Sequence, residues 1–315
     1  MINLNWLDKK TKELISELKL FSEKEIYEHI REKLKIVPVD TQESISKFLD
    51  NFSFWGSFHP TENDFSTLER LSKFLKENSE KFEKMYQSLE DYRSKKIFYA
   101  ILNNWYNYDF INLEQVMEKC FSHYFDLDII PSCQEEVFVD LGAFNGDTVE
   151  DFIKIYGDNY KKIYAYEMTE QSMRELKERV KNYPRIIYEQ KAVSDEVGMG
   201  SIKIHEISTS SNQLELEEIG EIEVTSLDDD IGEKITMIKM DIEGSELKAL
   251  KGAENHIIKD KPKLLLSVYH GYEELLTLWE YLEKLDLSYH YYLRYYGGPI
   301  FPTEIVLFAI QKCQI

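Results

Sequence analysis

The chain of 315 residues has few cysteines and no long apolar run. Its cysteines, Cys120, Cys133 and Cys313, are scattered and odd in number, so they fit neither a disulfide framework nor a zinc site. We interpret all three as buried apolar thiols in a reducing compartment. No run approaches the length of a membrane span, and residues 1–10 lack the apolar stretch of a signal peptide. These absences predict a cytoplasmic protein without a membrane span.

Positive charge is also scarce. The sequence has 38 Lys and Arg residues against 58 Asp and Glu residues, which gives a formal net charge of −20. A surface of this sign repels phosphate backbones, so we do not expect a nucleic-acid substrate. The expected partner is a small molecule or a glycan, and self-association into a homo-oligomer stays open.

Two phosphate-binding motifs are missing as well, because the chain contains neither G-x-G-x-x-G nor G-x-x-x-x-G-K-S/T. It has instead Glu136-Val-Phe-Val-Asp-Leu-Gly-Ala-Phe-Asn-Gly-Asp-Thr148, which predicts a buried strand, a glycine turn and the start of a helix. The acid in this turn would repel a pyrophosphate and attract an ammonium group. The loop therefore favours S-adenosylmethionine over NAD or ATP. The cofactor contacts expected from it are Asp140, Gly142, Asn145, Gly146 and Thr148.

A second strand is predicted at residues 162–166, and Glu167 follows it directly. An acid at the tip of the second strand can accept hydrogen bonds from both ribose hydroxyls of a bound nucleoside. Sites for NAD and for S-adenosylmethionine share this acid. Glu167 therefore predicts a nucleoside site without choosing between the two cofactors.

The chain changes pattern near residue 130. The first part shows apolar residues at helical spacing, with a capping box at Ser22-Glu-Lys-Glu25 and a further apolar helical face over residues 116–121. An aromatic, turn-rich loop at residues 54–60 could touch a substrate, although a buried structural loop is the simpler interpretation. We predict a helical accessory domain over residues 1–130 and a second domain over residues 131–315.

The second part alternates strands with helices, which predicts a mostly parallel sheet. Residues 201–204 are expected to extend an edge of that sheet. The last two strands flank Gly297-Gly298-Pro299, so they can pair as an antiparallel hairpin that closes the sheet. These last two strands are predicted at residues 289–294 and 304–310. The other predicted strands cover residues 185–188, 235–240 and 263–268.

From about residue 125 to residue 310, the sequence resembles the FkbM-type S-adenosylmethionine-dependent methyltransferases. The most specific match is Lys239-Met-Asp-Ile-Glu-Gly-Ser-Glu246 before a helix. The segments 136–148, 164–167 and 267–270 resemble other motifs of the family, and Ala192-Val-Ser-Asp195 resembles the segment beside the adenine. The resemblance implies an α/β fold of the class I methyltransferase type, Rossmann-like and preceded here by an all-helical domain. It leaves the role of that first domain open.

Candidate chemistry follows from the ends of the central strands. A hydroxyl acceptor must lose a proton during methyl transfer, and Asp241 and His270 are the candidate bases. Glu243, Tyr269 and Arg294 are the candidate contacts to the acceptor. Asp241, Glu243 and His270 also offer oxygen and nitrogen ligands that suit Mg²⁺ or Mn²⁺, so metal dependence stays open.

The resemblance implies an O-methyltransferase that modifies a sugar or glycan hydroxyl. Two alternatives stay open. One is an NAD-dependent oxidoreductase or epimerase, against which the missing G-x-G-x-x-G and the closing hairpin argue. The other is a cofactor-binding module without catalysis, against which the candidate bases argue.

Overall fold

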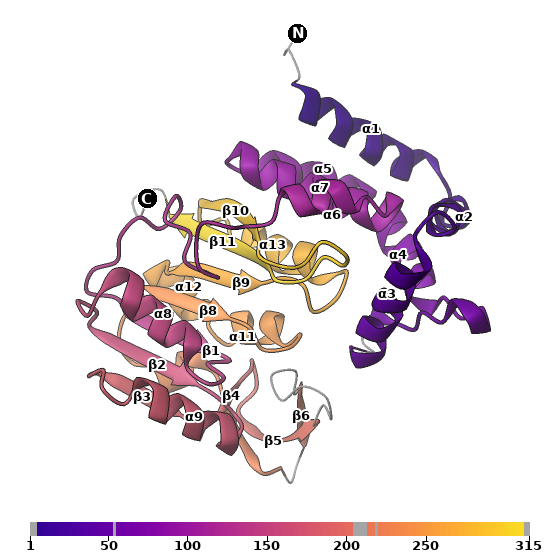
Figure 1. Cartoon of the computed structure of the whole chain (residues 1–315). Coiled ribbons are helices and arrows are strands. Elements are labelled where there is room, and N and C mark those ends of the chain that lie inside the picture. Colours follow the sequence, from indigo (N-terminus) through magenta and orange to yellow (C-terminus); the bar gives the residue numbers. More distant parts are fainter. Residues whose placement is uncertain (1–4, 53–54, 204–212, 218–219, 312–315) are drawn as a thin grey trace. The chain divides into compact units, whose positions relative to one another are not determined.

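A computed structural model describes residues 5–52, 55–203, 213–217 and 220–311. Helices come first along the chain, and the named strands begin at β1 (Figure 1). The predicted order, a helical part followed by alternating strands and helices, is confirmed. The helices of the first part are α1 (Trp6–Leu20), α2 (Glu23–Leu34), α3 (Val39–Asn51), the short 3₁₀ helix η2 (Pro60–Glu62), α4 (Ser66–Glu77), α5 (Ser79–Ser88), α6 (Tyr92–Asn107) and α7 (Phe110–Gln115).

Local sequence signals set some of these helix ends. The capping box predicted at the start of α2 is confirmed, because the Glu25 N–H donates to Ser22 Oγ at 3.3 Å and the Ser22 N–H donates to Glu25 Oε2 at 2.8 Å. The helical face predicted over residues 116–121 is wrong, because α7 ends at Gln115 and Val116 caps it. The apolar spacing there belongs to an irregular segment.

The cysteines differ in their surroundings. Cys133 is buried, as expected, and burial raises the pKa of its thiol to about 12. Cys120 is exposed, so the expectation of three buried thiols is wrong for it. Cys313 lies outside the described residues.

Contacts divide the chain into two compact units. The first unit joins Met1–Lys119 with two later segments, Val268–Trp279 and Tyr291–Val306. The second unit holds Cys120–Ser267, Glu280–His290 and Leu307–Ile315. The division does not fall at a single position, so the boundary expected near residue 130 stays a prediction about domains.

An aromatic cluster forms the core of the first unit. The Tyr272 ring lies 4.6 Å from that of Trp55 and 5.6 Å from that of Trp105, centroid to centroid and edge to face. Trp55 and Phe58 are almost fully buried, so this part of the aromatic loop 54–60 packs in the core. Phe54 lies outside the described residues.

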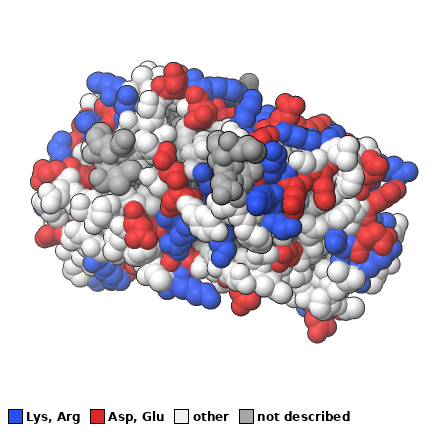
Figure 2. Space-filling model, turned by 90° about the horizontal axis from the view of Figure 1, so that it is seen from above, with Lys and Arg blue, Asp and Glu red and all other residues white. Residues whose placement is uncertain are grey.

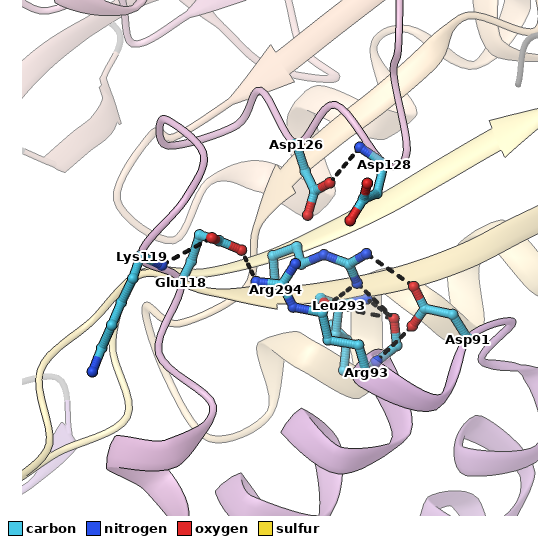
Figure 3. Close-up of polar contacts among 9 residues, drawn as sticks. Asp91, Arg93, Glu118, Lys119, Asp126, Asp128, Leu293 and Arg294 are labelled. Carbon is cyan, nitrogen blue, oxygen red and sulfur yellow. Dashed lines mark hydrogen bonds and ion pairs between the residues drawn. The ribbon is translucent and has the colours of Figure 1, made fainter.

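In the same unit, Asp91 caps α6 and also pairs with the buried Arg294. Its Oδ1 accepts from the Ser94 N–H at 2.6 Å, which caps α6, and its Oδ2 accepts from Arg294 Nη2 at 2.9 Å (Figure 3). Arg294 Nη1 also donates to Ser94 Oγ at 3.1 Å. The first turn of α6 is thereby fixed to β10 (Tyr289–Tyr295).

The main sheet has seven strands in the order β10-β11-β9-β8-β1-β2-β3. The strands β1, β2, β3, β8 and β9 pair in parallel, and the consecutive strands β10 and β11 close one end as a hairpin. This confirms the predicted class I methyltransferase architecture. The other strand bounds are β1 Val137–Leu141, β2 Lys162–Tyr166, β3 Ile186–Glu189, β8 Met237–Met240, β9 Lys263–Ser267 and β11 Ile305–Gln311.

Helices follow the parallel strands and pack in groups. Right-handed crossovers place helices on opposite faces when the strand order runs in opposite directions from the centre. α8 and α9, which follow β1 and β2, contact each other, and α10 contacts α12 (Figure 1). These helices are α8 (Asp147–Tyr156), α9 (Glu170–Val180), α10 (Leu227–Asp230), α11 (Glu246–Lys251), α12 (Glu254–Asp260) and α13 (Glu274–Lys284).

A second sheet was not expected from the sequence. It has four strands in the order β4-β7-β5-β6 and contains parallel and antiparallel pairs. Residues 201–203 belong to this sheet, so the prediction that they extend the main sheet is wrong, and Ile204 lies outside the described residues. The strands are β4 (Ala192–Val193), β5 (Gly198–Lys203), β6 (Gln213–Glu217) and β7 (Ile222–Thr225).

The surface carries both signs of charge. Figure 2 shows Lys and Arg side chains interspersed with Asp and Glu side chains on one face. Among the described residues, no helix combines the length and apolarity that crossing a membrane requires.

One surface cluster gives the fold a dependence on pH. Lys161 Nζ lies 2.8 Å from Glu233 Oε2, Lys162 also pairs with this carboxylate, and the Tyr164 hydroxyl donates to it at 3.0 Å. Hydrogen bonds from Lys161 and then Lys162 lower the pKa of Glu233 to about 2. Because this pKa lies below the ordinary 4.5, the stabilisation is present above pH 4.5 and is lost as the pH falls towards 2.

Glu233→Gln should lower the free energy of unfolding at pH 7 by about 1 kcal/mol, since the pair is partly exposed and screened. The difference from wild type should shrink as the pH is lowered from 4.5 towards 3. Urea unfolding at several pH values measures both, with the exposed Glu196→Gln as control. A difference independent of pH would contradict the role given to Glu233.

Candidate functional site

The direction of the strand order reverses at the centre of the main sheet. From β1 the chain continues to β2 and β3 on one side, and later reaches β8 and β9 on the other side. In open α/β sheets, ligands bind at the carboxyl ends of the strands where this reversal occurs. The candidate site is therefore the edge where β1 ends at Leu141 and β8 ends at Met240.

A pocket lies at this edge, entirely within the second unit. The empty space at this edge, open solvent included, is about 630 Å³. The residues that line it come from the ends of β1, β2, β3 and β8 and from β4. They are Leu141, Gly142, Phe144, Tyr166, Glu167, Met168, Thr169, Lys191, Ala192, Val193, Asp241, Ile242, Glu243 and Ser245.

Gly142 is required by a close approach of two backbone segments. Its φ is +75°, and a Cβ placed on it would lie 1.9 Å from the carbonyl oxygen of Asp241. The amides of Gly142 and Ala143 both donate to the carbonyl oxygen of Tyr166, at 3.1 and 2.9 Å. The glycine therefore lets the segments after β1 and β8 meet beside the pocket.

Glu167 lies on the pocket wall and is itself held by the protein. Its Oε2 accepts from the Phe144 N–H at 3.1 Å, and its Oε1 accepts from the Thr169 N–H and hydroxyl at 2.7 and 2.8 Å. Burial raises the pKa of Glu167 above its ordinary value, against the effect of these bonds. A carboxylate has about four lone-pair positions, so Glu167 can accept about one further hydrogen bond.

Asp140 is fully buried in β1 and does not line the pocket. Its Oδ1 lies 3.0 Å from Nζ of Lys239, which is 2% exposed. Burial raises the pKa of Asp140, and the neighbouring ammonium opposes this effect. The contact between Asp140 and a cofactor ammonium stays a prediction.

Asp241 follows β8 and faces the pocket. Its Oδ2 accepts from the Tyr124 hydroxyl at 2.7 Å, and the same hydroxyl lies 2.9 Å from Ser267 Oγ at the end of β9. Tyr124 has a φ of +69°, an uncommon conformation for a non-glycine residue. His123 stacks on Tyr124 at 4.0 Å between ring centroids, and burial lowers the pKa of His123 to about 4.

The turn after Asp241 is held by α11, the helix that follows it. The Glu246 carboxylate accepts from the Ile242 N–H at 2.7 Å, and Glu243 adopts a φ of +57°. Glu243 and Asp241 both line the pocket and offer oxygen ligands to a divalent cation. A metal at this position stays a prediction.

Four other predicted cofactor contacts lie outside the lining of the pocket. Gly146 caps α8 with a φ of +83°, and Asn145 Oδ1 accepts from the N–H of the residue that starts this helix. Thr148 lies in the first turn of α8, and Asp195 is exposed after β4. The structure thus gives Asn145 and Gly146 a part in the turn, while their contact with a cofactor is untested, as it is for Thr148 and Asp195.

The remaining predicted residues belong to the first unit. The backbone N–H of His270 donates to Glu274 Oε2 at 2.7 Å, and the centroid of the His270 ring lies 4.3 Å from that of the Tyr269 ring. Arg294 is 1% exposed and bonded to Asp91 and Ser94. Contact of these three residues with an acceptor stays a prediction, and the bonds of Arg294 give it a structural task.

Several residues of the site were missed by sequence reasoning. Lys191 lines the pocket and lies 2.9 Å from Asp230, which also accepts from the Tyr166 hydroxyl at 2.7 Å. Lys239 carried a readable signal, because a lysine within the apolar strand Met237–Met240 needs a partner when it is buried. Tyr124 carried none, since its partners lie far away in the chain.

Comparison with known proteins agrees with the fold and the motifs. Residues 140–291 match the family described as Methyltransferase FkbM domain, so the resemblance is confirmed for this part of the chain. A comparison with curated proteins found no match. The solved structure of the FkbM methyltransferase from Methylobacillus flagellatus KT is similar with 26% identity and a TM-score of 0.63.

That alignment covers 76% of this chain but 60% of the Methylobacillus protein, so the chain spans less than two thirds of the relative's length. Two other solved structures have TM-scores below 0.5, too low to support an inference about this chain. An rRNA methylase from Streptococcus thermophilus has 16% identity and a TM-score of 0.38, covering 56% of this chain and 89% of its own. Aeropyrum pernix fibrillarin, solved with bound S-adenosyl-L-methionine, has 13% identity and a TM-score of 0.37, covering 56% and 67%.

Gly142→Ala should destabilise the protein by roughly 2 to 6 kcal/mol, because it adds a steric collision to the strain of a positive φ. Gly157→Ala is the matched control, since Gly157 has a φ of +81° and nothing lies within 4 Å of an added Cβ. Gly157 has a ψ of −169°, outside the left-handed helical region, so we expect that variant to lose about 1 to 3 kcal/mol through backbone strain alone. Urea unfolding compares the two, and equal losses would contradict the close approach at Gly142.

Proposed function

Since residues 140–291 match the FkbM methyltransferase domain family, we propose that the protein is an S-adenosylmethionine-dependent methyltransferase. We further propose that it acts on oxygen, with a sugar or glycan hydroxyl as the acceptor. The observation that carries the cofactor is the pocket at the strand reversal, where Glu167 meets the Gly142 turn. The acceptor class rests on the resemblance to the family.

The residues of the pocket fit the proposed cofactor. Apolar walls from Phe144, Met168, Val193 and Ile242 suit a flat adenine ring, and Glu167 retains about one acceptor position for a ribose hydroxyl. The glycine at 142 keeps the turn free of a side chain. When bound, S-adenosylmethionine supplies a methyl group on a positively charged sulfur.

The acceptor must be positioned and deprotonated by the protein. Methyl transfer to a hydroxyl depends mostly on alignment of the reacting atoms, and a base that takes the proton adds to the rate. Asp241 faces the pocket, and the Tyr124 hydroxyl fixes the orientation of its carboxylate. We assign Asp241 as the first candidate base and keep His270 as the second.

The charge of the chain supports a small or glycan acceptor over nucleic acid. A net charge of −20 opposes binding of a phosphate backbone. Glu243 on the pocket wall can accept hydrogen bonds from the hydroxyls of a sugar. Sugar rings also pack on aromatic faces, which is the role proposed for Tyr269.

S-adenosylhomocysteine should bind to the wild-type protein in the micromolar range, and NAD should not, because the pocket lacks a glycine loop for a pyrophosphate. Isothermal titration calorimetry with each compound tests this. Binding of NAD without binding of S-adenosylhomocysteine would favour an oxidoreductase. Failure to bind either would remove the proposed cofactor.

Glu167→Ala should weaken the binding of S-adenosylhomocysteine by roughly 1 to 3 kcal/mol, the range of a hydrogen bond to a charged group. The variant also releases the amide of Phe144, so its folding is checked by circular dichroism. Glu170→Ala, at an exposed position close by, serves as the control. An unchanged dissociation constant in the folded variant would take Glu167 out of the site.

Asp241→Asn should lower turnover on a sugar acceptor on the order of 10² to 10⁴-fold, because loss of a general base has effects of this size. His270→Ala should behave likewise if it is the base instead. Transfer of a labelled methyl group to a panel of sugars measures turnover, with the exposed Asp158→Asn as control. If Asp241→Asn is inactive while His270→Ala is normal, a chelator separates a base from a metal ligand.

A further inference from the structure

Two opposite charges face each other in the centre of the main sheet. Asp140 of β1 and Lys239 of β8 are partners in the parallel register of the two strands, and their side chains are 0% and 2% exposed. The Lys239 ammonium lies 3.0 Å from Asp140 Oδ1. The pair is therefore shielded from water on all sides.

Lys239 has further partners in the turn after β1. Its Nζ donates to the carbonyl oxygen of Gly142 at 2.7 Å and lies 3.3 Å from that of Leu141. The ammonium therefore makes an ion pair with Asp140 and hydrogen bonds to the two carbonyls. The ring of Tyr124 lies 5.3 Å from the same nitrogen.

The hydrogen bonds of Lys239 connect the ion pair directly to residues that line the pocket. Leu141 and Gly142 line the pocket, whereas Asp140 and Lys239 do not. Two residues after Gly142, the Phe144 N–H donates to Glu167. The shape of the turn thus sets the position of the Phe144 amide that donates to Glu167.

We propose that Asp140 and Lys239 are positioning residues, which hold the Leu141–Gly142 turn in its binding shape without touching the ligand. Lys239 fixes the two carbonyls, and Asp140 supplies the negative charge that a buried ammonium needs. The proposal rests on the proposed function for the identity of the ligand.

A rival assignment exists for Asp140. Among the described residues, its Oδ2 accepts no hydrogen bond, and the ammonium of the cofactor's amino-acid part is a possible donor. The two assignments differ in one respect. A direct contact affects only ligands that carry the ammonium, whereas a distorted turn affects every ligand of the pocket.

The test uses two ligands, S-adenosylhomocysteine and 5′-methylthioadenosine, which lacks the amino-acid part. Calorimetry, with competition for the weaker ligand, compares wild type with Asp140→Asn and Lys239→Met. We expect each variant to weaken both ligands by the same factor, roughly tenfold or more. If Asp140→Asn weakens only S-adenosylhomocysteine, Asp140 contacts the ligand and the proposal is overturned.

A second buried pair provides the control. Lys263 Nζ lies 2.6 Å from Glu136 Oε1, with side chains 9% and 5% exposed, at the amino ends of the strands and away from the pocket. Lys263→Met should reduce stability and leave both affinities unchanged. If it weakens the two ligands as much as Lys239→Met does, loss of stability explains both effects and the proposal falls.

Single variants of a buried pair can fail to fold. The double variant Asp140→Leu with Lys239→Met replaces both charges by apolar side chains, which a buried position tolerates better. It should fold, and it should bind both ligands more weakly than the wild type does, because the carbonyls of Leu141 and Gly142 have lost their donor. Wild-type affinity in the folded double variant would refute the positioning role.

A further readout needs no ligand. The amides of Gly142 and Ala143 are bonded to the Tyr166 carbonyl, and their hydrogen exchange reports how firmly the turn is held. We expect faster exchange in residues 141–146 of Lys239→Met and of the double variant, and no change in Lys263→Met. Unchanged exchange would overturn the proposal. A wild type that fails to bind S-adenosylhomocysteine would instead overturn the proposed function.

Discussion

The close approach of Gly142 to the carbonyl of Asp241 is the constraint on which the pocket depends. The space that a Cβ would need is filled by the backbone of the neighbouring strand end. The segments after β1 and β8 can therefore meet directly at the reversal of strand order. Backbone amides and neighbouring side chains then hold the polar groups of the pocket, as the Phe144 amide and the Thr169 hydroxyl hold Glu167, which favours a fixed geometry.

Buried charge is used in both units of the chain, and in both it organises backbone. In the first unit, Asp91 caps α6 and at the same time neutralises the buried Arg294. In the second unit, Lys239 bonds two carbonyls and is neutralised by Asp140. A buried ion pair adds little stability by itself. What these pairs provide is a defined place for a helix end and for a turn.

The sequence predicted the parts of the site that depend on local pattern. An apolar strand followed by an acid and a glycine places Gly142 and Glu167 at strand ends, and their pocket follows from parallel pairing. The partners of Arg294 and Tyr124 could not be predicted, because they depend on which distant segments become neighbours. The second sheet was missed because its strands are short, from two residues in β4 to six in β5, and the apolar–polar alternation of β6 and β7 covers too few residues to identify a strand alone.

The first unit is discontinuous, and this has a consequence for how the protein is made. Its N-terminal helices leave the ribosome before the segments Val268–Trp279 and Tyr291–Val306, which belong to the same unit. At roughly 5 to 20 residues per second, synthesis of the intervening residues takes on the order of 10 to 30 seconds. During this time Trp55 and Trp105 lack Tyr272, the ring that packs against both. Until residue 272 has been synthesised, the nascent helices therefore lack one of the rings that pack against these two tryptophans.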